Sequence, residues 1–232
     1  MLKAPNLSAI GWLTHGFGQR DSVYPPAILT IRQIHSDIVV EAGDGTAEGD
    51  AIVSNEAGVV AGIRTADCVP VLLADTRTRA VACVHAGWRG SARNIVAAAV
   101  QELISRYGSR PEDLSAAVGP SIGVCCYEVG PDVARNFGSW IPGAEKTVQP
   151  VHLDLAAVNE YQLRAAGVRD VWKAGRCTFC EADGYFSFRR EREQAGRMVS
   201  YIGILVPAET GGAETRRADR TGFSLTGPAK SA

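Results

Sequence analysis

Short apolar runs divided by turn residues fill the segment between residues 51 and 85. Glycine, asparagine and aspartate separate successive runs, which is the pattern of β-strands joined by tight turns. We expect strands at 51–53, 58–63, 69–74 and 79–85. Similar runs farther along the chain predict strands at 115–118, 169–173 and 198–205.

A helical pattern follows directly in the segment SARNIVAAAVQELISRYG. Its apolar residues recur at every third or fourth position, which favours an amphipathic helix. Ser91 is the expected N-cap, and Gly108 lies just past the expected end. A second helix is predicted from Asp154, as N-cap, to Gly167, and a shorter one after Pro131.

Together these elements predict an α+β fold with mixed sheets. Strands outnumber helices, and most neighbouring strands are too close in sequence for a helical crossover, which argues against a doubly wound parallel sheet. The length of 232 residues fits one domain, which we place at 1–206. The segment 207–232 is rich in Gly, Thr and charge and lacks periodicity, so we expect a mobile tail.

Charge and composition narrow the partners. The chain has 24 basic and 25 acidic residues, a formal charge of −1, so it lacks the basic surface typical of nucleic-acid and anionic-membrane binding. Any anionic ligand must therefore be held by local arginines. The N-terminus shows no secretory signal, and no segment reaches the length of a membrane span, so we expect a cytoplasmic protein. In that setting the six cysteines are better explained as buried thiols or metal ligands than as disulfides.

Three candidate ligands flank the predicted strands. His35 closes the apolar segment ILTIRQIH, Cys68 precedes the strand at 69–74, and His85 ends the strand at 79–85. Strand ends from different parts of a sheet can converge on one point, although the spacing matches no local metal motif. A histidine after a strand is more often a hydrogen-bonded structural residue, and a single cysteine is more often a small buried apolar group. Asp67 beside Cys68 favours a polar site instead, because a carboxylate packs poorly there.

Several longer motifs make the chain resemble a known family. They are TADCVPVLLAD, HAGWRG, GPSIGVCCYEVG, LDLAAVNEYQLRAAGV and YFSFRR, in family order from about residue 15 to 204. The chain resembles the YfiH-like laccase-domain (polyphenol oxidase) family, described as purine nucleoside phosphorylases with adenosine deaminase activity. The resemblance implies a layered α-β-β-α sandwich and a zinc ion held by His35, Cys68 and His85. The segment between the HGF and QIH motifs is shorter here than in the family, so a loop that could cover the substrate is missing.

The resemblance implies purine nucleosides and phosphate as substrates, with methylthioadenosine as a further possibility. Three protein ligands leave the fourth tetrahedral position of zinc open, which is typical of a catalytic site, and zinc lowers the pKa of a bound water to roughly 7. Asp67 is the expected proton shuttle for deamination. Phosphorolysis needs cationic groups for phosphate, for which Arg89, Arg189 and Arg190 are candidates. Gln33 and Cys126 are further expected substrate contacts.

Three other functions are alternatives. A copper polyphenol oxidase with a trinuclear cluster needs more imidazoles than the four histidines supply, and a blue-copper centre has only Met1 and Met198 as axial candidates. A metal-free cysteine hydrolase would use Cys68 as nucleophile and His85 as base. A non-catalytic zinc module could use a closed site of four thiolates, which adjacent cysteines fit poorly: Cys125, Cys126, Cys177 and Cys180. The choice between a monomer and a homodimer stays open.

Overall fold

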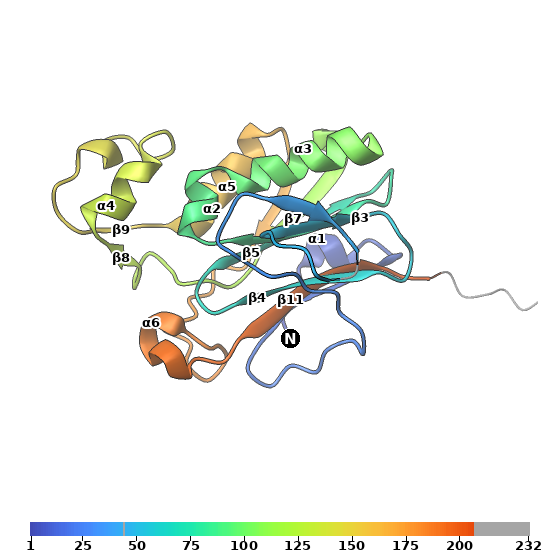
Figure 1. The fold of residues 1–232 in the computed structure, drawn as a ribbon, viewed down its shortest axis with the longest axis horizontal. Coiled ribbons are helices and arrows are strands. Elements are labelled where there is room, and N and C mark those ends of the chain that lie inside the picture. The colour runs from blue at the N-terminus through green and yellow to red at the C-terminus, as the bar shows by residue number, and fades with distance from the viewer. Residues whose placement is uncertain (44, 207–232) are drawn as a thin grey trace, which may run out of the picture.

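The fold is a stack of two sheets with its two longest helices, α3 (Ile95–Tyr107) and α5 (Leu155–Ala165), on one side (Figure 1). The computed structural model describes residues 1–43 and 45–206. The strands are β1 (Leu13–Phe17), β2 (Val39–Glu41), β3 (Ala51–Ser54), β4 (Val60–Thr65), β5 (Val69–Asp75), β6 (Val81–Ala86), β7 (Leu114–Val118), β8 (Glu128–Val129), β9 (Val151–His152), β10 (Asp170–Lys173) and β11 (Met198–Ile204). The α-helices are α1 (Pro5–Ser8), α2 (Trp88–Ala92), α3 (Ile95–Tyr107), α4 (Pro131–Ala134), α5 (Leu155–Ala165) and α6 (Phe188–Glu191).

Both main sheets are built largely from antiparallel pairs. The larger sheet has the order β10-β7-β5-β6-β3-β2, and the smaller one has the order β1-β11-β4. In the larger sheet the inner pairs are antiparallel, whereas the edge pairs β10/β7 and β2/β3 are parallel. A third, two-stranded sheet pairs β8 with β9. The predicted α+β class with mixed sheets is confirmed.

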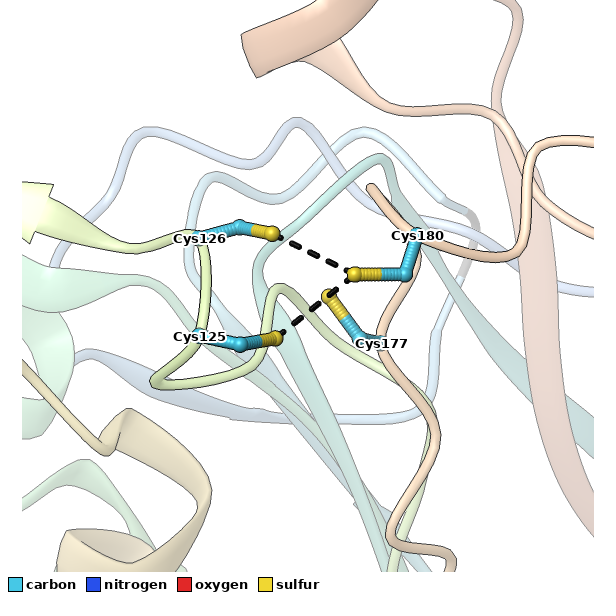
Figure 2. Close-up of side chains that lie close together, drawn as sticks. All are labelled: Cys125, Cys126, Cys177 and Cys180. Atoms are coloured by element: carbon cyan, nitrogen blue, oxygen red, sulfur yellow. Dashed lines mark hydrogen bonds between the residues drawn. The ribbon is translucent and has the colours of Figure 1, made fainter.

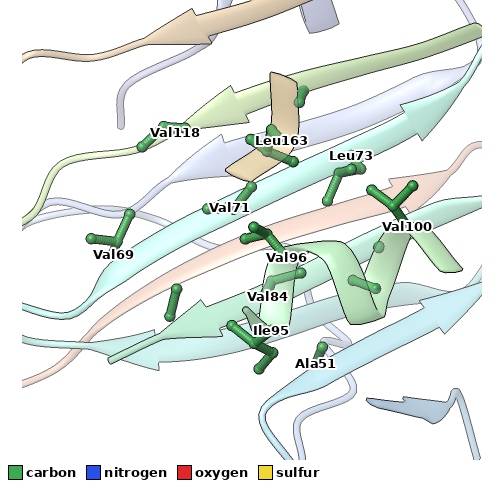
Figure 3. Close-up of a cluster of buried hydrophobic side chains, with 14 of the residues drawn as sticks. Ala51, Val69, Val71, Leu73, Val84, Ile95, Val96, Val100, Val118 and Leu163 are labelled. Carbon is green, nitrogen blue, oxygen red and sulfur yellow. The ribbon is translucent and has the colours of Figure 1, made fainter. Parts of the chain in front are cut away.

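The alternation of side chains along β5 explains the two apolar layers. Val69, Val71 and Leu73 pack with α3 and α5, whereas Leu72 packs between the two sheets with Ile63. Figure 3 shows the first layer, in which the residues of β5 lie beside side chains of α3 and α5. Because both faces of β5 are covered, its sequence is an almost continuous apolar run.

The helical layers of the sandwich are unequal. Among the described residues only α3 and α5 are longer than five residues, and both cover the outer face of the six-stranded sheet. The short α1 packs against β1, β7 and β10, with Leu7 buried in the layer between the sheets. The described helices therefore provide one thick helical layer, on the side of the larger sheet.

One predicted helix begins differently from the sequence expectation. Ser91 does not cap the helix after β6 but lies buried inside the short α2, where its Oγ accepts a hydrogen bond from Asn159 Nδ2 at 2.9 Å. Asn94 then interrupts the helix with a φ of +64°, and α3 begins at Ile95. The prediction of Ser91 as N-cap was wrong because tertiary hydrogen bonds take its hydroxyl.

The other predicted elements agree with the structure to within a few residues. Asp154 caps α5 by accepting a hydrogen bond from the Ala157 N–H at 2.8 Å, and Gly108 ends α3 in the left-handed conformation. Sequence reasoning missed β1 and the short β2. The expected mobile tail at 207–232 lies outside the described residues. Within those residues, the helices all fall short of the length and apolar character that a membrane crossing requires.

Candidate metal centre

The larger sheet brings three strand ends to one point. Because β6 runs antiparallel to both β3 and β5, its C-terminal end lies beside the N-terminal ends of its two neighbours. His85 lies near the end of β6, Cys68 directly precedes β5, and Asp50 directly precedes β3. Residues 35 apart in the sequence are therefore neighbours in the fold.

His35, Cys68 and His85 form a cluster that can hold a metal ion, here called the His/Cys/His cluster. Each residue offers one ligand atom, and the three atoms lie within 4.8 Å of one another. The two imidazole rings stand nearly edge to face, with centroids 5.0 Å apart at 77°. A Cβ at Gly87 would lie 3.0 Å from His35 Cδ2 and 3.2 Å from Cys68 Sγ, so the bare glycine leaves room for the three ligands.

Asp50 holds the imidazole of His85 and the backbone of His35. Its carboxylate is fully buried, and Oδ1 lies 2.7 Å from His85 Nδ1. The same carboxylate accepts backbone hydrogen bonds from His35 at 3.0 Å and from Ser36 at 2.5 Å, and a hydroxyl hydrogen bond from Ser36 at 2.7 Å. Burial opposes ionisation, but these donors and His85 lower the pKa of Asp50 to about 2. A carboxylate behind a ligating histidine fixes its tautomer and raises its basicity.

Two residues in or beside the cluster have a strained backbone. His35 and Asp67 have φ values of +58° and +88°, in the left-handed region that costs an L-residue roughly 1–2 kcal/mol. The hydrogen bonds to Asp50 hold His35 there, and Asp67 is fixed by its own side-chain contacts. Strain that the surrounding structure maintains is typical of functional sites.

Without metal, the cluster favours a thiolate beside an imidazolium. Burial opposes ionisation of Cys68, but the charge on His85 and hydrogen bonds from both histidines lower its pKa to about 6. Burial likewise opposes the charge on His85, whose pKa the Cys68 thiolate and Asp50 raise to about 9. A metal ion binds the deprotonated thiol and neutral imidazole, so metal binding releases protons near neutral pH.

The His/Cys/His cluster lies at the wall of a cavity of about 870 Å³. Its lining includes six arginines: Arg32, Arg64, Arg89, Arg189, Arg192 and Arg197. Within the described residues Arg32 is the one member of this group in a salt bridge, with Glu48 at 2.5 Å. The other five guanidinium groups give the cavity a positive character that suits an anionic ligand.

Two of the predicted catalytic residues line this cavity. Arg89 is exposed in α2, with its guanidinium 4.3 Å from the centroid of the Trp88 ring. Asp67 is nearly buried, and its carboxylate accepts three hydrogen bonds: from Thr178 Oγ1 at 2.7 Å, Ser187 Oγ at 3.0 Å and the Arg189 N–H at 2.6 Å. These contacts anchor the backbone beside Cys68.

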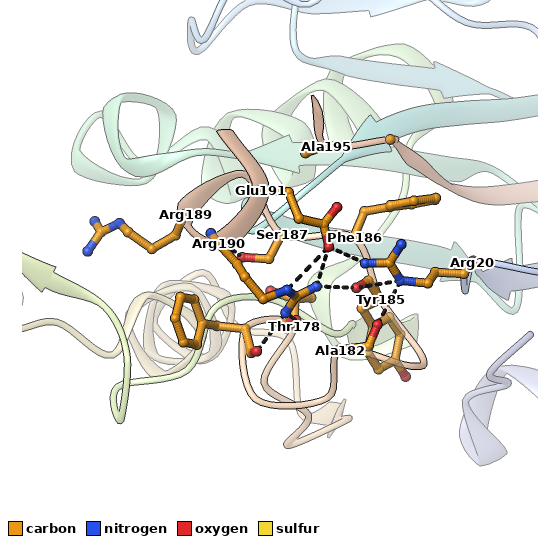
Figure 4. Close-up of polar contacts among 12 residues, drawn as sticks. Arg20, Thr178, Ala182, Tyr185, Phe186, Ser187, Arg189, Arg190, Glu191 and Ala195 are labelled. Carbon is orange, nitrogen blue, oxygen red and sulfur yellow. Dashed lines mark hydrogen bonds and ion pairs between the residues drawn. The ribbon is translucent and has the colours of Figure 1, made fainter. Parts of the chain in front are cut away.

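The predicted substrate contacts divide into two groups. Gln33 and Arg189 line the cavity, although the Gln33 amide is bonded at both ends to the backbone of Arg64. The structure does not bring Cys126 and Arg190 among the lining residues that it describes. Figure 4 shows Arg190 turned toward backbone carbonyls, including that of Thr178, and toward the Glu191 carboxylate. Arg190 thus joins segments of the chain, and Cys126 lies among three other cysteines.

Sequence reasoning missed Asp50 and most of the cavity arginines. Asp50 carries the same signal as Cys68, because both directly precede an apolar run, but an aspartate there is also an ordinary turn residue. Arg192 and Arg197 come from segments that follow α6, which no pattern linked to the strand ends.

Comparison with known proteins gives consistent matches. The family model described as multi-copper polyphenol oxidoreductase laccase matches residues 19–205. A purine nucleoside phosphorylase of Deinococcus radiodurans is 43% identical over 180 residues, covering 75% of this chain and 69% of the relative. Adenosine deaminase RL5, from an unidentified prokaryote, is 37% identical over 172 residues, covering 70% of this chain and 65% of the relative. The crystal structure of the Bacillus licheniformis hypothetical protein YfiH has a TM-score of 0.76 at 27% identity, covering 83% of this chain and 92% of that one.

Proposed function

The chain belongs to the multi-copper polyphenol oxidoreductase laccase family, the YfiH-like proteins, and on that basis we propose that it is a metal-dependent enzyme of purine nucleosides. We propose phosphorolysis as its main reaction and adenosine deamination as a second one. The relatives named purine nucleoside phosphorylase and adenosine deaminase support this proposal. The observation that carries it is the His/Cys/His cluster at the wall of an arginine-lined cavity.

The donor set fits a zinc ion. Two imidazoles and one thiolate, with Asp50 behind His85, match a three-ligand zinc site that keeps one position open. A blue-copper centre with an axial methionine fits less well, because Met198 lies in β11 with its Sδ accepting a hydrogen bond from the Phe186 N–H. Neither Met1 nor Met198 is among the described residues that line the cavity.

A multinuclear copper cluster also lacks ligands. His15 lies in β1, where its Nε2 accepts a hydrogen bond from the Ala4 N–H at 3.0 Å, and His152 is exposed beside Val124. Neither histidine is among the described cavity residues, so only two imidazoles are available there. We therefore propose zinc as the native metal and nucleoside chemistry in preference to polyphenol oxidation.

The residues of the chain would bind and orient the substrate. When bound, a divalent ion supplies Lewis-acid polarisation to the ligand in its open position. Tyr127, Trp88 and the partly exposed Phe188 line the cavity and offer aromatic faces for a purine ring. In phosphorolysis a phosphate oxygen displaces the purine from ribose C1′, so the cavity must hold an anion beside the sugar. Arg89 and Arg189 are the proposed phosphate ligands.

A nucleoside panel tests this proposal. The zinc-loaded protein is incubated with adenosine, inosine and guanosine, with and without phosphate, and the products are separated by chromatography. We expect free base and ribose 1-phosphate only when phosphate is present, and inosine with ammonia from adenosine in its absence. No conversion of any purine nucleoside by the metal-loaded protein would contradict the proposal.

Arg89 can be tested by the phosphate dependence of the reaction. Arg89→Ala should raise the phosphate concentration needed for half-maximal phosphorolysis by roughly tenfold or more, because a charge-assisted hydrogen bond is lost. Arg89→Lys should restore only part, since an ammonium group cannot reproduce the bidentate guanidinium. An unchanged phosphate dependence in Arg89→Ala would rule out this role, and deamination without phosphate serves as the control reaction.

Asp67 remains the first carboxylate to test as a proton shuttle, because it lines the cavity beside Cys68. Its three hydrogen bonds support a positioning role as well. If Asp67 moves a proton in deamination, Asp67→Asn should lower deamination much more than phosphorolysis. Equal losses in the two reactions would assign it the positioning role alone.

A metal-free cysteine hydrolase is the second candidate, and one observation favours it. The lowered pKa of Cys68 and the raised pKa of His85 describe the ion pair that such an enzyme uses. Chelation separates the two: a zinc enzyme loses activity when the metal is removed and regains it with Zn²⁺, whereas a thiol hydrolase keeps its activity. We keep the cytoplasm, where cysteines stay reduced, as the proposed location.

A further inference from the structure

Two loops of the larger sheet bring four cysteines together, here called the four-cysteine cluster: Cys125, Cys126, Cys177 and Cys180. Because β7 and β10 are parallel neighbours, the loops that follow them leave the same edge of the sheet. A bridge between Ser121 and Cys177 extends this pairing into the loops, with the Thr178 N–H donating to the Ser121 carbonyl at 2.9 Å. The first loop supplies two adjacent cysteines and the second a C-x-x-C pair.

The four sulfurs point toward one another (Figure 2). All of them lie within 4.8 Å of one another, and Cys180 Sγ lies 3.3 Å from Cys126 Sγ and 3.6 Å from Cys125 Sγ. A tetrahedral zinc ion with Zn–S bonds of about 2.3 Å holds its sulfurs about 3.8 Å apart. A disulfide needs an S–S distance of about 2.05 Å, so the spacing fits a shared ion better than a covalent bond.

Backbone groups prepare the cluster for thiolate. The Gly123 N–H donates to Cys177 Sγ at 3.2 Å. A Cβ at Gly123 would lie 3.2 Å from Cys177 Cβ and 3.3 Å from Cys125 Sγ, so the bare glycine eases the close approach of the two loops. A donated N–H group favours a thiolate over a thiol at Cys177.

We propose that the four-cysteine cluster is a second metal site, which binds Zn²⁺ through four thiolates. Four protein ligands close the coordination sphere, so this ion holds structure and performs no chemistry. Among the described residues, the cysteines of the cluster are absent from the lining of the catalytic cavity. The site does not depend on the proposed nucleoside activity.

The position of the second site indicates what it stabilises. The first loop continues to Tyr127 and Glu128, which line the cavity, and the second carries Thr178, which donates its hydroxyl to Asp67 at 2.7 Å. An ion shared by the two loops would therefore fix one wall of the cavity and, through Asp67, the backbone beside Cys68. Disordering of either loop would widen the cavity.

Metal content of single-site variants tests the proposal. The full chain is purified reduced, loaded with Zn²⁺, freed of excess metal, and its zinc per chain is measured by plasma mass spectrometry. We expect two ions in the wild type, one in Cys68→Ala and one in Cys177→Ser. Cys83→Ala is the matched control, because Cys83 is buried outside both clusters, and it should keep two ions. The proposal would be overturned if Cys177→Ser still bound two zinc ions per chain. It would also be overturned if the wild type bound a single zinc ion that was lost in Cys68→Ala and kept in Cys177→Ser.

A measurement on the wild type keeps the test valid if a variant fails to fold. Cobalt(II) replaces zinc, and thiolate-to-cobalt charge-transfer absorption reports the number of coordinating sulfurs. The absorption should rise in two phases, one with the intensity of four thiolates and one with that of a single thiolate. In parallel, the four cysteines of the loops should resist alkylation while zinc is bound and react after chelation. Equal alkylation with and without zinc, or a disulfide between the loops in the reduced protein, would contradict the second site.

Discussion

The two sulfur-containing clusters of this molecule are built in opposite ways. The His/Cys/His cluster lies at the ends of inner strands, backed by a buried carboxylate and open to a cavity. The four-cysteine cluster lies on two loops, supported by backbone N–H groups, and two of its thiols are exposed to solvent. In the first cluster, the sheet holds His35 and the neighbouring Asp67 in a strained left-handed conformation. In the second, a metal ion bound by the four cysteines would hold the two loops together.

The difference separates a site for chemistry from a site for structure. A catalytic ion needs an open position and precise ligands, which a strand end with a buried Asp50 provides. A structural ion needs only enough ligands to close its coordination sphere, and flexible loops can supply them. The sheet therefore determines the geometry of the first cluster, whereas the proposed metal would determine the geometry around the second.

Exchanging one cysteine in each cluster is the strongest way to break this comparison. Cys68→Ala should lower turnover of purine nucleosides by roughly a hundred- to a thousandfold, as loss of a group that holds the reacting centre does, while unfolding stays cooperative. Cys180→Ala should lower turnover much less than Cys68→Ala, through loosening of one cavity wall, and should lower the melting temperature by several degrees, measured by calorimetry on the zinc-loaded protein. The reverse pattern would exchange the roles of the two clusters.

Asp50→Asn sharpens the comparison, because it acts on one cluster only. The amide keeps the shape of the side chain but loses the negative charge behind His85, so zinc affinity at the His/Cys/His cluster should fall about 10–100-fold. Competition with a chromophoric chelator measures the affinity of each site. The affinity of the four-cysteine cluster should not change, and an equal loss at both sites would show that Asp50 acts through general stability.

The thiols of the two clusters should also differ in reactivity when metal is absent. The pKa of Cys68 is lowered to about 6, so its thiolate is present above that pH and lost below it. The pKa of Cys126 is raised, so this thiol stays protonated at pH 7. Alkylation of chelated protein at pH 7, followed by mass spectrometry, should modify Cys68 about tenfold faster than Cys126. A midpoint for Cys68 labelling near the ordinary thiol pKa would contradict the ion pair with His85.

Substitution of one glycine beside each cluster should have the smallest effect on zinc affinity, and the two variants form a matched pair. The methyl group of Gly87→Ala would lie 3.0 Å from His35 Cδ2, and that of Gly123→Ala would lie 3.2 Å from Cys177 Cβ. Each neighbour must move by a few tenths of an ångström, so each variant should weaken zinc binding several-fold at its own cluster and leave the other unchanged. The chelator competition that tests Asp50 measures this too, and a loss at both clusters in either variant would contradict their independence.

Sequence patterns predicted the inner strands well because these strands are buried on both faces. β5 is apolar at almost every position, whereas β1 has Thr14, His15 and Gly16 between its two large apolar residues and β2 has only three residues, and both were missed. The His/Cys/His cluster could be proposed because its members precede or end apolar runs. The four-cysteine cluster was considered but disfavoured, because adjacent cysteines match no metal motif and only the parallel pairing of β7 with β10 brings the two loops together.

The buried hydrogen bonds between α2 and α5 have a consequence for motion. The five residues of α2 have no side-chain cap, and the Ser91 hydroxyl and carbonyl are held by Asn159 and Gln162 of α5. Because α2 is too short to be stable alone, it should open and close together with α5 as one cooperative unit. Arg89 would then move together with α5, and amino-acid changes on the part of α5 beyond Leu155, which itself lines the cavity, would alter anion binding without touching the ligand.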